Sequence, residues 1–168
     1  GYAEAYNNLG NALNELGRHE EAITSYNKAI EIRFDFPEAH SNLGNAFNKI
    51  GRHEESIASF NTAIGIRPDF AEAYNNLGIA LNEIGKHEEA ITSYNKAIEL
   101  RPDYAGAYNN LGNAFKALGK HEEAITNLNK ALELQPDFSE VHYNLGNVFS
   151  ELGKHEEAIT SYNKAIEL

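Results

Sequence analysis

Apolar residues recur along the chain at steps of three and four, which is the spacing of one face of an α-helix. Within residues 71–84 they are Ala73, Tyr74, Leu77, Gly78, Ala80, Leu81 and Ile84. Within residues 87–101 they are Ala90, Ile91, Tyr94, Ala97, Ile98 and Leu100. Polar residues fill most of the places between them. The pattern predicts two amphipathic helices, one over each stretch, packed together through their apolar faces.

The same pair of helical patterns returns with a period of 34 residues, and residues 71–104 are a near-copy of residues 3–36. A fixed period of this length indicates a solenoid, in which each unit is too small to fold alone and is stabilised by its neighbours. The sequence therefore predicts one solenoid over residues 1–168, with units at 3–36, 37–70, 71–104, 105–138 and 139–168.

Glycine and proline mark the helix ends. Glycine suits the residue just after a helix, where the left-handed conformation is common, and it follows each first helix at Gly17, Gly51, Gly85, Gly119 and Gly153. Proline, which lacks the amide hydrogen that another turn would use, ends the second helix at Pro68, Pro102 and Pro136. An aspartate followed three residues later by a glutamate predicts a capping box at Asp35/Glu38, Asp69/Glu72 and Asp137/Glu140.

A second set of glycines stands in the middle of the first helices, at Gly10, Gly44, Gly78, Gly112 and Gly146. Glycine is unfavourable there, so we expect each to pack closely against a large side chain. Gly65 and Gly106 are departures from the repeat, and each should weaken its helix by up to ~1 kcal/mol relative to alanine.

Counted from Ala3 as position 1, the units carry an aromatic residue at position 4, Leu-Gly at 7 and 8, alanine at 20 and 27, an aromatic residue at 24 and proline at 32. In the third unit these are Tyr74, Leu77, Gly78, Ala90, Ala97, Tyr94 and Pro102. The whole chain thus resembles a tetratricopeptide repeat (TPR) array. The resemblance implies an all-α, right-handed superhelical solenoid of five helix-turn-helix units and ten helices, with the first helices lining a concave groove. It implies an architecture rather than an activity.

Composition narrows the class of partner. The formal charge of −11 and the pI near 5.0 oppose binding to nucleic acid, which needs clustered Lys and Arg. The sequence contains no cysteine, so it offers no thiol chemistry. No apolar run approaches the length of a membrane span. We expect no membrane partner and a cytoplasmic location.

The histidines are candidate metal ligands that the spacing argues against. Each unit begins its second helix with His-Glu-Glu, at His19, His53, His87, His121 and His155, and this is not the HExxH motif of zinc proteases. Successive imidazoles should lie roughly 10 Å apart, which is too far to share a metal ion. We expect them to pack at helix starts, and His40 and His142, which replace the aromatic residue at position 4, to be core or interface residues. No catalytic constellation and no cofactor site is expected, so the chain is interpreted as non-enzymatic.

Asparagines form the candidate binding site. Position 6 holds Asn8, Asn42, Asn76, Asn110 and Asn144, and position 9 holds Asn11, Asn45, Asn113 and Asn147. A carboxamide both donates and accepts hydrogen bonds, so it can hold a peptide backbone without reading side chains. First helices ~10 Å apart match about three residues of an extended strand. The pattern resembles the asparagine ladder in the TPR region of O-linked N-acetylglucosamine transferase, which implies a similar peptide-binding role.

An alternative is that the asparagines form a merely hydrated face, because recent duplication copies neutral residues as faithfully as useful ones. Position 5 varies where position 6 does not, which favours the ladder. Ile79 and Tyr143 depart from asparagine and would receive apolar ligand side chains, or are ordinary exposed residues. The first-helix stripe carries seven glutamates and two lysines, which favours a neutral or basic peptide.

The leading hypothesis is a protein-protein interaction scaffold that binds an extended peptide or partner segment in its groove. Two alternatives stay open. One is the substrate-recruiting fragment of a larger enzyme. The other is a self-assembling module: neither end shows the polar cap of a terminal repeat, which predicts that the chain is an interior piece of a longer protein. In that case, copies would stack end to end, with Ala158, Ile159, Tyr162 and Ile166 meeting the first helix of another molecule.

Overall fold

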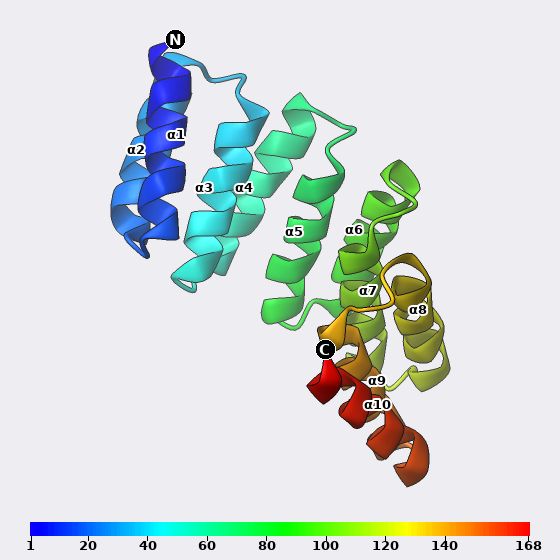
Figure 1. Ribbon diagram of the computed structural model, residues 1–168. Helices are drawn as coiled ribbons and strands as arrows, with labels where there is room; N and C mark the ends of the chain where they lie inside the picture. Colours follow the sequence, from blue (N-terminus) through cyan, green and yellow to red (C-terminus); the bar gives the residue numbers. More distant parts are fainter. The chain divides into compact units, whose positions relative to one another are not determined.

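A computed structural model describes all 168 residues, Gly1–Leu168, and it is all α-helical (Figure 1). The ten helices alternate between first and second helices of the repeat, and they confirm the predicted all-α solenoid fold of five units. They are α1 (Tyr2–Glu15), α2 (His19–Ile32), α3 (Pro37–Lys49), α4 (His53–Ile66), α5 (Ala71–Glu83), α6 (His87–Leu100), α7 (Ala105–Ala117), α8 (His121–Leu134), α9 (Ser139–Glu151) and α10 (His155–Glu167).

The chain divides into two compact units, residues 1–85 with helices α1 to α5 and residues 86–168 with helices α6 to α10. Within each unit every helix packs against the next one along the chain. First helices also contact one another, α1 with α3 and α3 with α5 in one unit, and α7 with α9 in the other. Each unit therefore presents a row of neighbouring first helices.

The turns within each repeat follow the expectation from glycine. Gly17 and Gly85 have φ angles of 74° and 77°, in the left-handed region. The first of these turns is closed by two backbone hydrogen bonds, from Gly17 N to Asn14 O at 3.0 Å and from Arg18 N to Leu13 O at 2.9 Å. They satisfy carbonyl groups that the end of α1 leaves free.

The mid-helix glycines pack against large residues, as predicted. A Cβ atom at Gly10 would overlap the ring of Tyr26, and one at Gly146 would lie 2.5 Å from the ring of Tyr162. Leu128 takes the same place over Gly112, at 2.7 Å. The first and second helices of a repeat thus approach so closely that only a hydrogen atom fits between backbone and side chain.

The core lies where each second helix meets the first helix that follows it. In the first unit, Ile23 and Tyr26 of α2 pack against Leu43 and Phe47 of α3. In the second unit, α8 supplies Ala124, Leu128 and Ala131, and α9 supplies Val141, Leu145 and Val148. Every internal junction between repeats therefore buries apolar positions of both helices, as expected for units that are stable only when stacked.

The predicted capping boxes are wrong. First helices α3, α5 and α9 begin after Phe36, Phe70 and Phe138, none of which caps with its side chain. The aromatic residue occupies the N-cap position, so the aspartate lies at N′ and the glutamate at N2, each one residue too early for a capping box. Glu38 binds arginine instead: its Oε1 accepts from Arg67 Nη1 at 2.6 Å, while that guanidinium stacks 3.5 Å from the Phe70 ring centroid.

Candidate functional site

The position-6 asparagines all stand on first helices, with differing exposure. Asn8 is exposed, Asn42, Asn76 and Asn110 are half-buried, and Asn144 is buried. This gradation arises because the side chains take part in contacts between neighbouring first helices. They are therefore not a freely hydrated row.

In the first unit the amides bond to one another. Asn42 Nδ2 on α3 donates to Asn7 Oδ1 on α1 at 3.0 Å, and Asn76 Nδ2 on α5 donates to Asn45 Oδ1 on α3 at 3.1 Å. Asn76 Oδ1 accepts from its neighbour Asn75 at 3.2 Å. In this unit a hydrogen bond between asparagine side chains thus joins each first helix to the previous one.

The second unit repeats the link in a more buried form. Asn144 Nδ2 on α9 donates to Asn109 Oδ1 on α7 at 2.8 Å. Asn109 Nδ2 in turn donates to Glu140 Oε1 at 3.0 Å, and only 2% of Asn109 is exposed. A buried amide with both ends bonded fixes the spacing of the two helices, since an unpaired polar group there would be costly.

Position 5 supplies two of these hydrogen-bond partners, Asn7 and Asn109, which the sequence pattern did not indicate. Asn7, Ser41, Asn75 and Asn109 are all buried at this position. The residue at position 5 varies along the sequence, yet the structure places it between neighbouring first helices. The available signal was the restriction to small or amide side chains in four repeats out of five, which fits a crowded polar contact.

Tyrosine hydroxyls orient two of the position-9 asparagines. Tyr26 Oη donates to Asn11 Oδ1 at 2.9 Å, and Tyr162 Oη donates to Asn147 Oδ1 at 2.9 Å. Burial, with a smaller contribution from Glu15, raises the pKa of Tyr26 to about 12, so this phenol stays protonated and able to donate at neutral pH. These bonds leave the amide hydrogens of Asn11 and Asn147 for other acceptors.

The fourth repeat lacks that hydroxyl. Leu128 stands where Tyr26 and Tyr162 stand in other repeats, and Asn113 Oδ1 is buried without a hydrogen-bond partner. The position-9 row is therefore uneven: Asn45 accepts from Asn76, Ile79 carries no amide, and Asn113 keeps an unsatisfied carbonyl.

Leu128→Tyr is expected to stabilise the second unit relative to Leu128→Phe by about 0.5–1.5 kcal/mol, the net worth of one hydrogen bond. Gly112 leaves the same space that Gly10 leaves for Tyr26, so the ring fits, and only tyrosine supplies a donor to Asn113. Urea unfolding followed by circular dichroism measures the difference. In an Asn113→Ala background the two variants should become equal, and a difference that persists there would show that the hydroxyl bonds elsewhere.

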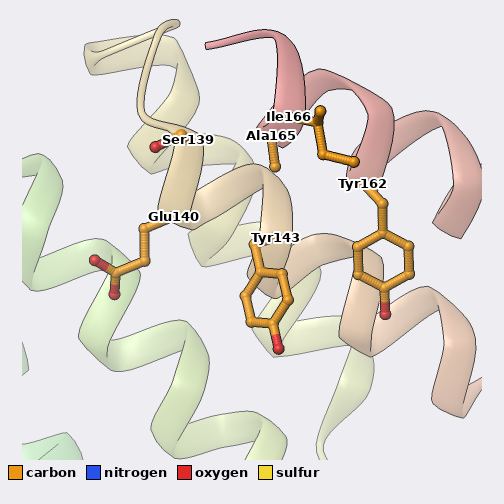
Figure 2. A pocket seen from close by; sticks show the side chains of 6 residues that line it. All are labelled: Ser139, Glu140, Tyr143, Tyr162, Ala165 and Ile166. Atoms are coloured by element: carbon orange, nitrogen blue, oxygen red, sulfur yellow. The ribbon is translucent and has the colours of Figure 1, made fainter.

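Ile79 and Tyr143 differ in how far their side chains are exposed to solvent. Ile79 is half-buried on α5, whereas Tyr143 on α9 is exposed. The ring of Tyr143 lies 5.9 Å from that of Tyr162 on α10, measured between centroids. Figure 2 shows both rings at the edge of a hollow of about 480 Å³, lined also by Ser139, Glu140, Ala165 and Ile166.

The histidines begin second helices, where the sequence placed them. His19 Nδ1 and His53 Nδ1 lie 2.6 and 2.7 Å from the Oδ1 atoms of Asn14 and Asn48. In the fourth repeat, Lys116 stands at the position of that asparagine. The Nδ1 atom of His121 lies 3.6 Å from Glu151 Oε2 instead. The contacts of His19 and His53 tie the end of a first helix to the start of the second helix of the same repeat, whereas His121 contacts the first helix of the next repeat.

The two histidines at position 4 brace the loops between repeats. His40 Nε2 lies 2.9 Å from the Phe34 carbonyl oxygen, and His142 Nε2 lies 3.1 Å from that of Pro136. Both side chains are half-buried, in keeping with an interface position.

Ion pairs occupy part of the acidic stripe. Glu4 and Glu38 are bound by Arg33 and Arg67, which come from the ends of second helices. Arginines of the second helices therefore neutralise part of the seven-to-two excess of glutamate over lysine on the first helices. The ten helices are all too short or too polar to cross a lipid bilayer.

Comparisons with known proteins agree with this architecture. A family model described as "TPR repeat" matches residues 10–51, 44–85, 80–119 and 112–153, and one described as "Tetratricopeptide repeat" matches residues 139–168. Among curated protein sequences, none matches the chain.

Similar solved structures share the fold over nearly the whole chain. A crystal structure of MamA is 29% identical, with a TM-score of 0.82 over 94% of this chain and 92% of that one. A thermophilic TPR protein from Thermus thermophilus, TTC0263, is 26% identical, with a TM-score of 0.82 over 98% and 90%. PilF of Pseudomonas aeruginosa has a TM-score of 0.90 at 23% identity, covering 99% of this chain and 76% of that one.

Proposed function

Since the chain belongs to the tetratricopeptide repeat family, we propose that it is a non-enzymatic protein-interaction scaffold that holds an extended peptide against its first helices. Proteins of this family bind proteins or peptides, and arrays of this kind are typical interaction modules. The observation that carries the proposal is that side-chain amides on neighbouring first helices are oriented by hydrogen bonds within the protein.

The internal hydrogen bonds of Asn42 and Asn76 use only part of the hydrogen-bonding capacity of these two side chains. A carboxamide has two N–H donors and an oxygen that accepts twice. Asn42 gives one donor to Asn7, and Asn76 gives one to Asn45 and accepts one bond from Asn75. Side chains that are already held in place lose little conformational freedom when a ligand binds, which favours affinity.

The spacing of the helices suits a backbone ligand. Neighbouring first helices at the usual interaxial distance of ~10 Å correspond to about three residues of an extended chain. Adjacent asparagines would then meet equivalent backbone groups of the peptide. Such contacts bind backbone groups of the peptide and select only weakly among peptide sequences. The pattern resembles the asparagine ladder of O-linked N-acetylglucosamine transferase in this respect.

Selectivity would come from the places that depart from asparagine. Ile79 on α5 and Tyr143 on α9 offer apolar surface to a ligand side chain. Most exposed charges of the chain are acidic, and the net charge is −11, which favours a neutral or basic peptide. Each hydrogen bond from an asparagine side chain to the peptide contributes about 0.5–1.5 kcal/mol net. We therefore expect dissociation constants on the order of 1 μM for a short peptide.

Replacing Asn42, Asn76 and Asn110 together by alanine is expected to weaken peptide binding at least about tenfold, which corresponds to losing ~1.4 kcal/mol. The measurement is fluorescence anisotropy with 12-residue peptides selected from a random library against the unaltered chain. Circular dichroism of the variant checks that the helices persist.

A matched control replaces three exposed asparagines of second helices, Asn61, Asn95 and Asn129, by alanine. The two variants share the same chemistry and number of changes, and differ only in the helix face they alter. Equal affinity for the first-helix variant and the control would remove the amide ladder from peptide binding.

A further inference from the structure

The asparagine ladder of the first unit has three rungs, the position-6 side-chain amides of the neighbouring helices α1, α3 and α5 (Figure 1). They belong to Asn8, Asn42 and Asn76. Cα atoms of α1 and α3, and of α3 and α5, approach within 8 Å of each other, and side-chain hydrogen bonds of 3.0 and 3.1 Å join the same pairs of helices. The rungs therefore repeat at the interaxial distance of closely packed helices, about 8–10 Å.

The rungs on α3 and α5 each keep one amide hydrogen for a ligand. Asn42 Nδ2 carries two hydrogens and gives one to Asn7. Asn76 Nδ2 likewise gives one of its two to Asn45, while its oxygen accepts from Asn75. Both side chains are only half-buried, so a ligand can reach them. What the two rungs share is a donor, and the acceptors that a peptide backbone offers to it are carbonyl oxygens.

A flat β-strand does not place its carbonyl groups at the spacing of these rungs. Its backbone groups alternate between two sides, and each residue adds about 3.3 Å. Carbonyls that face one side therefore recur at about 6.6 or about 13 Å, and neither distance matches rungs about 8–10 Å apart. Residues three apart have nearly the right spacing but face opposite sides. An α-helical ligand is unsuitable for another reason, because its carbonyls are bonded within the helix.

A polyproline II helix has the period that the rungs require. It has three residues per turn and rises about 3.1 Å per residue, so every third carbonyl faces the same side at intervals of about 9.3 Å. Its backbone makes no internal hydrogen bonds, which leaves each carbonyl free to accept one from an asparagine. Proline suits such a ligand, because it keeps the carbonyl and lacks only the N–H that these donors do not need.

Ile79 adds apolar surface beside the third rung. It stands three residues after Asn76 on α5, about one turn along the same helix face, and it is half-buried. In the first two repeats the same position holds Asn11 and Asn45. Proline-rich segments dock in grooves lined by apolar, usually aromatic, side chains. A pyrrolidine ring next to the carbonyl bound by Asn76 would contact Ile79, where the preceding repeats offer an amide.

We propose that the ligand of the first unit is a proline-rich segment in the polyproline II conformation, in which every third carbonyl accepts a hydrogen bond from a position-6 asparagine. This inference rests on the proposed peptide-binding function and narrows its class of partner. A segment of about seven residues spans the three rungs. Basic residues on its solvent-facing sides favour binding to this chain, whose net charge is −11. Because the segment is already extended when free, it loses little conformational entropy on binding.

Fluorescence anisotropy with two labelled nine-residue peptides tests the conformation of the ligand. One repeats Pro-Pro-Lys three times and the other repeats Thr-Val-Lys three times, so their length and charge are equal and only the first favours polyproline II. The proline peptide is expected to bind the unaltered chain at least about tenfold more tightly. Replacing Asn42 and Asn76 together by alanine should weaken its binding at least about fivefold, through the loss of two hydrogen bonds. Replacing Asn61 and Asn95, which are exposed on second helices, is the matched control and should leave its affinity unchanged.

The outcomes separate this inference from the proposed function. Equal or tighter binding of the Thr-Val-Lys peptide, with the same loss when Asn42 and Asn76 are replaced, would overturn the polyproline II conformation and keep the asparagine ladder. Library-selected peptides that bind through these asparagines while the proline peptide does not bind would have the same meaning. If replacing the asparagines changes the affinity of no peptide, the ladder is not the peptide site and both proposals are wrong.

Discussion

Gly44→Ala is expected to destabilise the chain by about 1–3 kcal/mol, the usual cost of forcing extra volume into a packed core. A Cβ atom at Gly44 would lie 2.9 Å from two ring atoms of Phe60. Phe60 is fully buried on α4, so its ring cannot swing into solvent to relieve the contact. The two helices of the second repeat would have to separate, which weakens packing along both. Equilibrium unfolding in urea, followed by circular dichroism, measures the change.

Gly65→Ala is the matched control, on the same helix as Phe60. Gly65 is also a helical glycine, but nothing lies within 4 Å of a Cβ atom placed there. Alanine should therefore stabilise the chain by up to about 1 kcal/mol through helix propensity alone. The same substitution thus has opposite signs at two positions of one repeat. Stabilisation by both variants would mean that the helices separate at little cost and that close approach does not explain Gly44.

The packing of these glycines could be predicted from the sequence. Glycine is unfavourable in the middle of a helix, so its presence there in every repeat indicates a tertiary contact that requires it. Gly44 recurs in phase with an aromatic or leucine residue on the next helix, and period and composition together identify the contact. Helix existence and the left-handed turn at Gly17 were predictable for similar reasons, since both depend on neighbours in sequence.

The prediction of capping boxes was wrong because the residue that binds the glutamate lies far away in sequence. Asp35 and Glu38 have the right spacing, but Phe36 takes the cap position and Glu38 turns to Arg67, 29 residues later. A charged hydrogen bond with a stacked guanidinium outweighs a local cap, and no local rule contains that arginine. A prediction from spacing alone cannot weigh the two.

For the asparagines, the sequence predicted the helix face but not the hydrogen bonds. Position 6 could be assigned to the first-helix face from helical spacing, but the bonds it makes depend on the rotation of two neighbouring helices. A shift of one position rotates a side chain by about 100°, so position 5 lies between helices while position 6 lies at the rim. Sequence spacing gives the face of Asn42 and Asn76, and only packing shows that Asn7 and Asn45 accept their hydrogen bonds.

Several supporting contacts are lost together in the fourth repeat. Leu128 removes the hydroxyl that would reach Asn113, and Lys116 replaces the asparagine that bonds the histidine in earlier repeats. Gln135 and Gly106 replace the arginine and glutamate that pair elsewhere, as Arg67 does with Glu38. The second unit therefore depends more heavily on the amide link between α7 and α9.

Asn109→Ala is expected to cost about 1–2 kcal/mol of stability for that reason. The substitution removes the acceptor of Asn144 Nδ2 in a buried place, and an unsatisfied buried donor costs roughly 1–3 kcal/mol. Alanine returns about 0.5 kcal/mol through helix propensity. Glu140, the other partner, is exposed and regains its hydrogen bond from water. Urea unfolding of the variant measures the net loss.

Asn113→Ala, one helical turn away on α7, is the control for Asn109→Ala. Comparing the two variants separates the loss of the Asn109 hydrogen bonds from the other effects of replacing asparagine by alanine. The control removes the same atoms and gains the same helix propensity, but its buried carbonyl has no partner to lose. Its stability should stay within about 0.5 kcal/mol of the original or rise, because an unsatisfied polar group disappears. Equal losses at the two positions would mean that shape alone, and not the amide link, holds α7 beside α9.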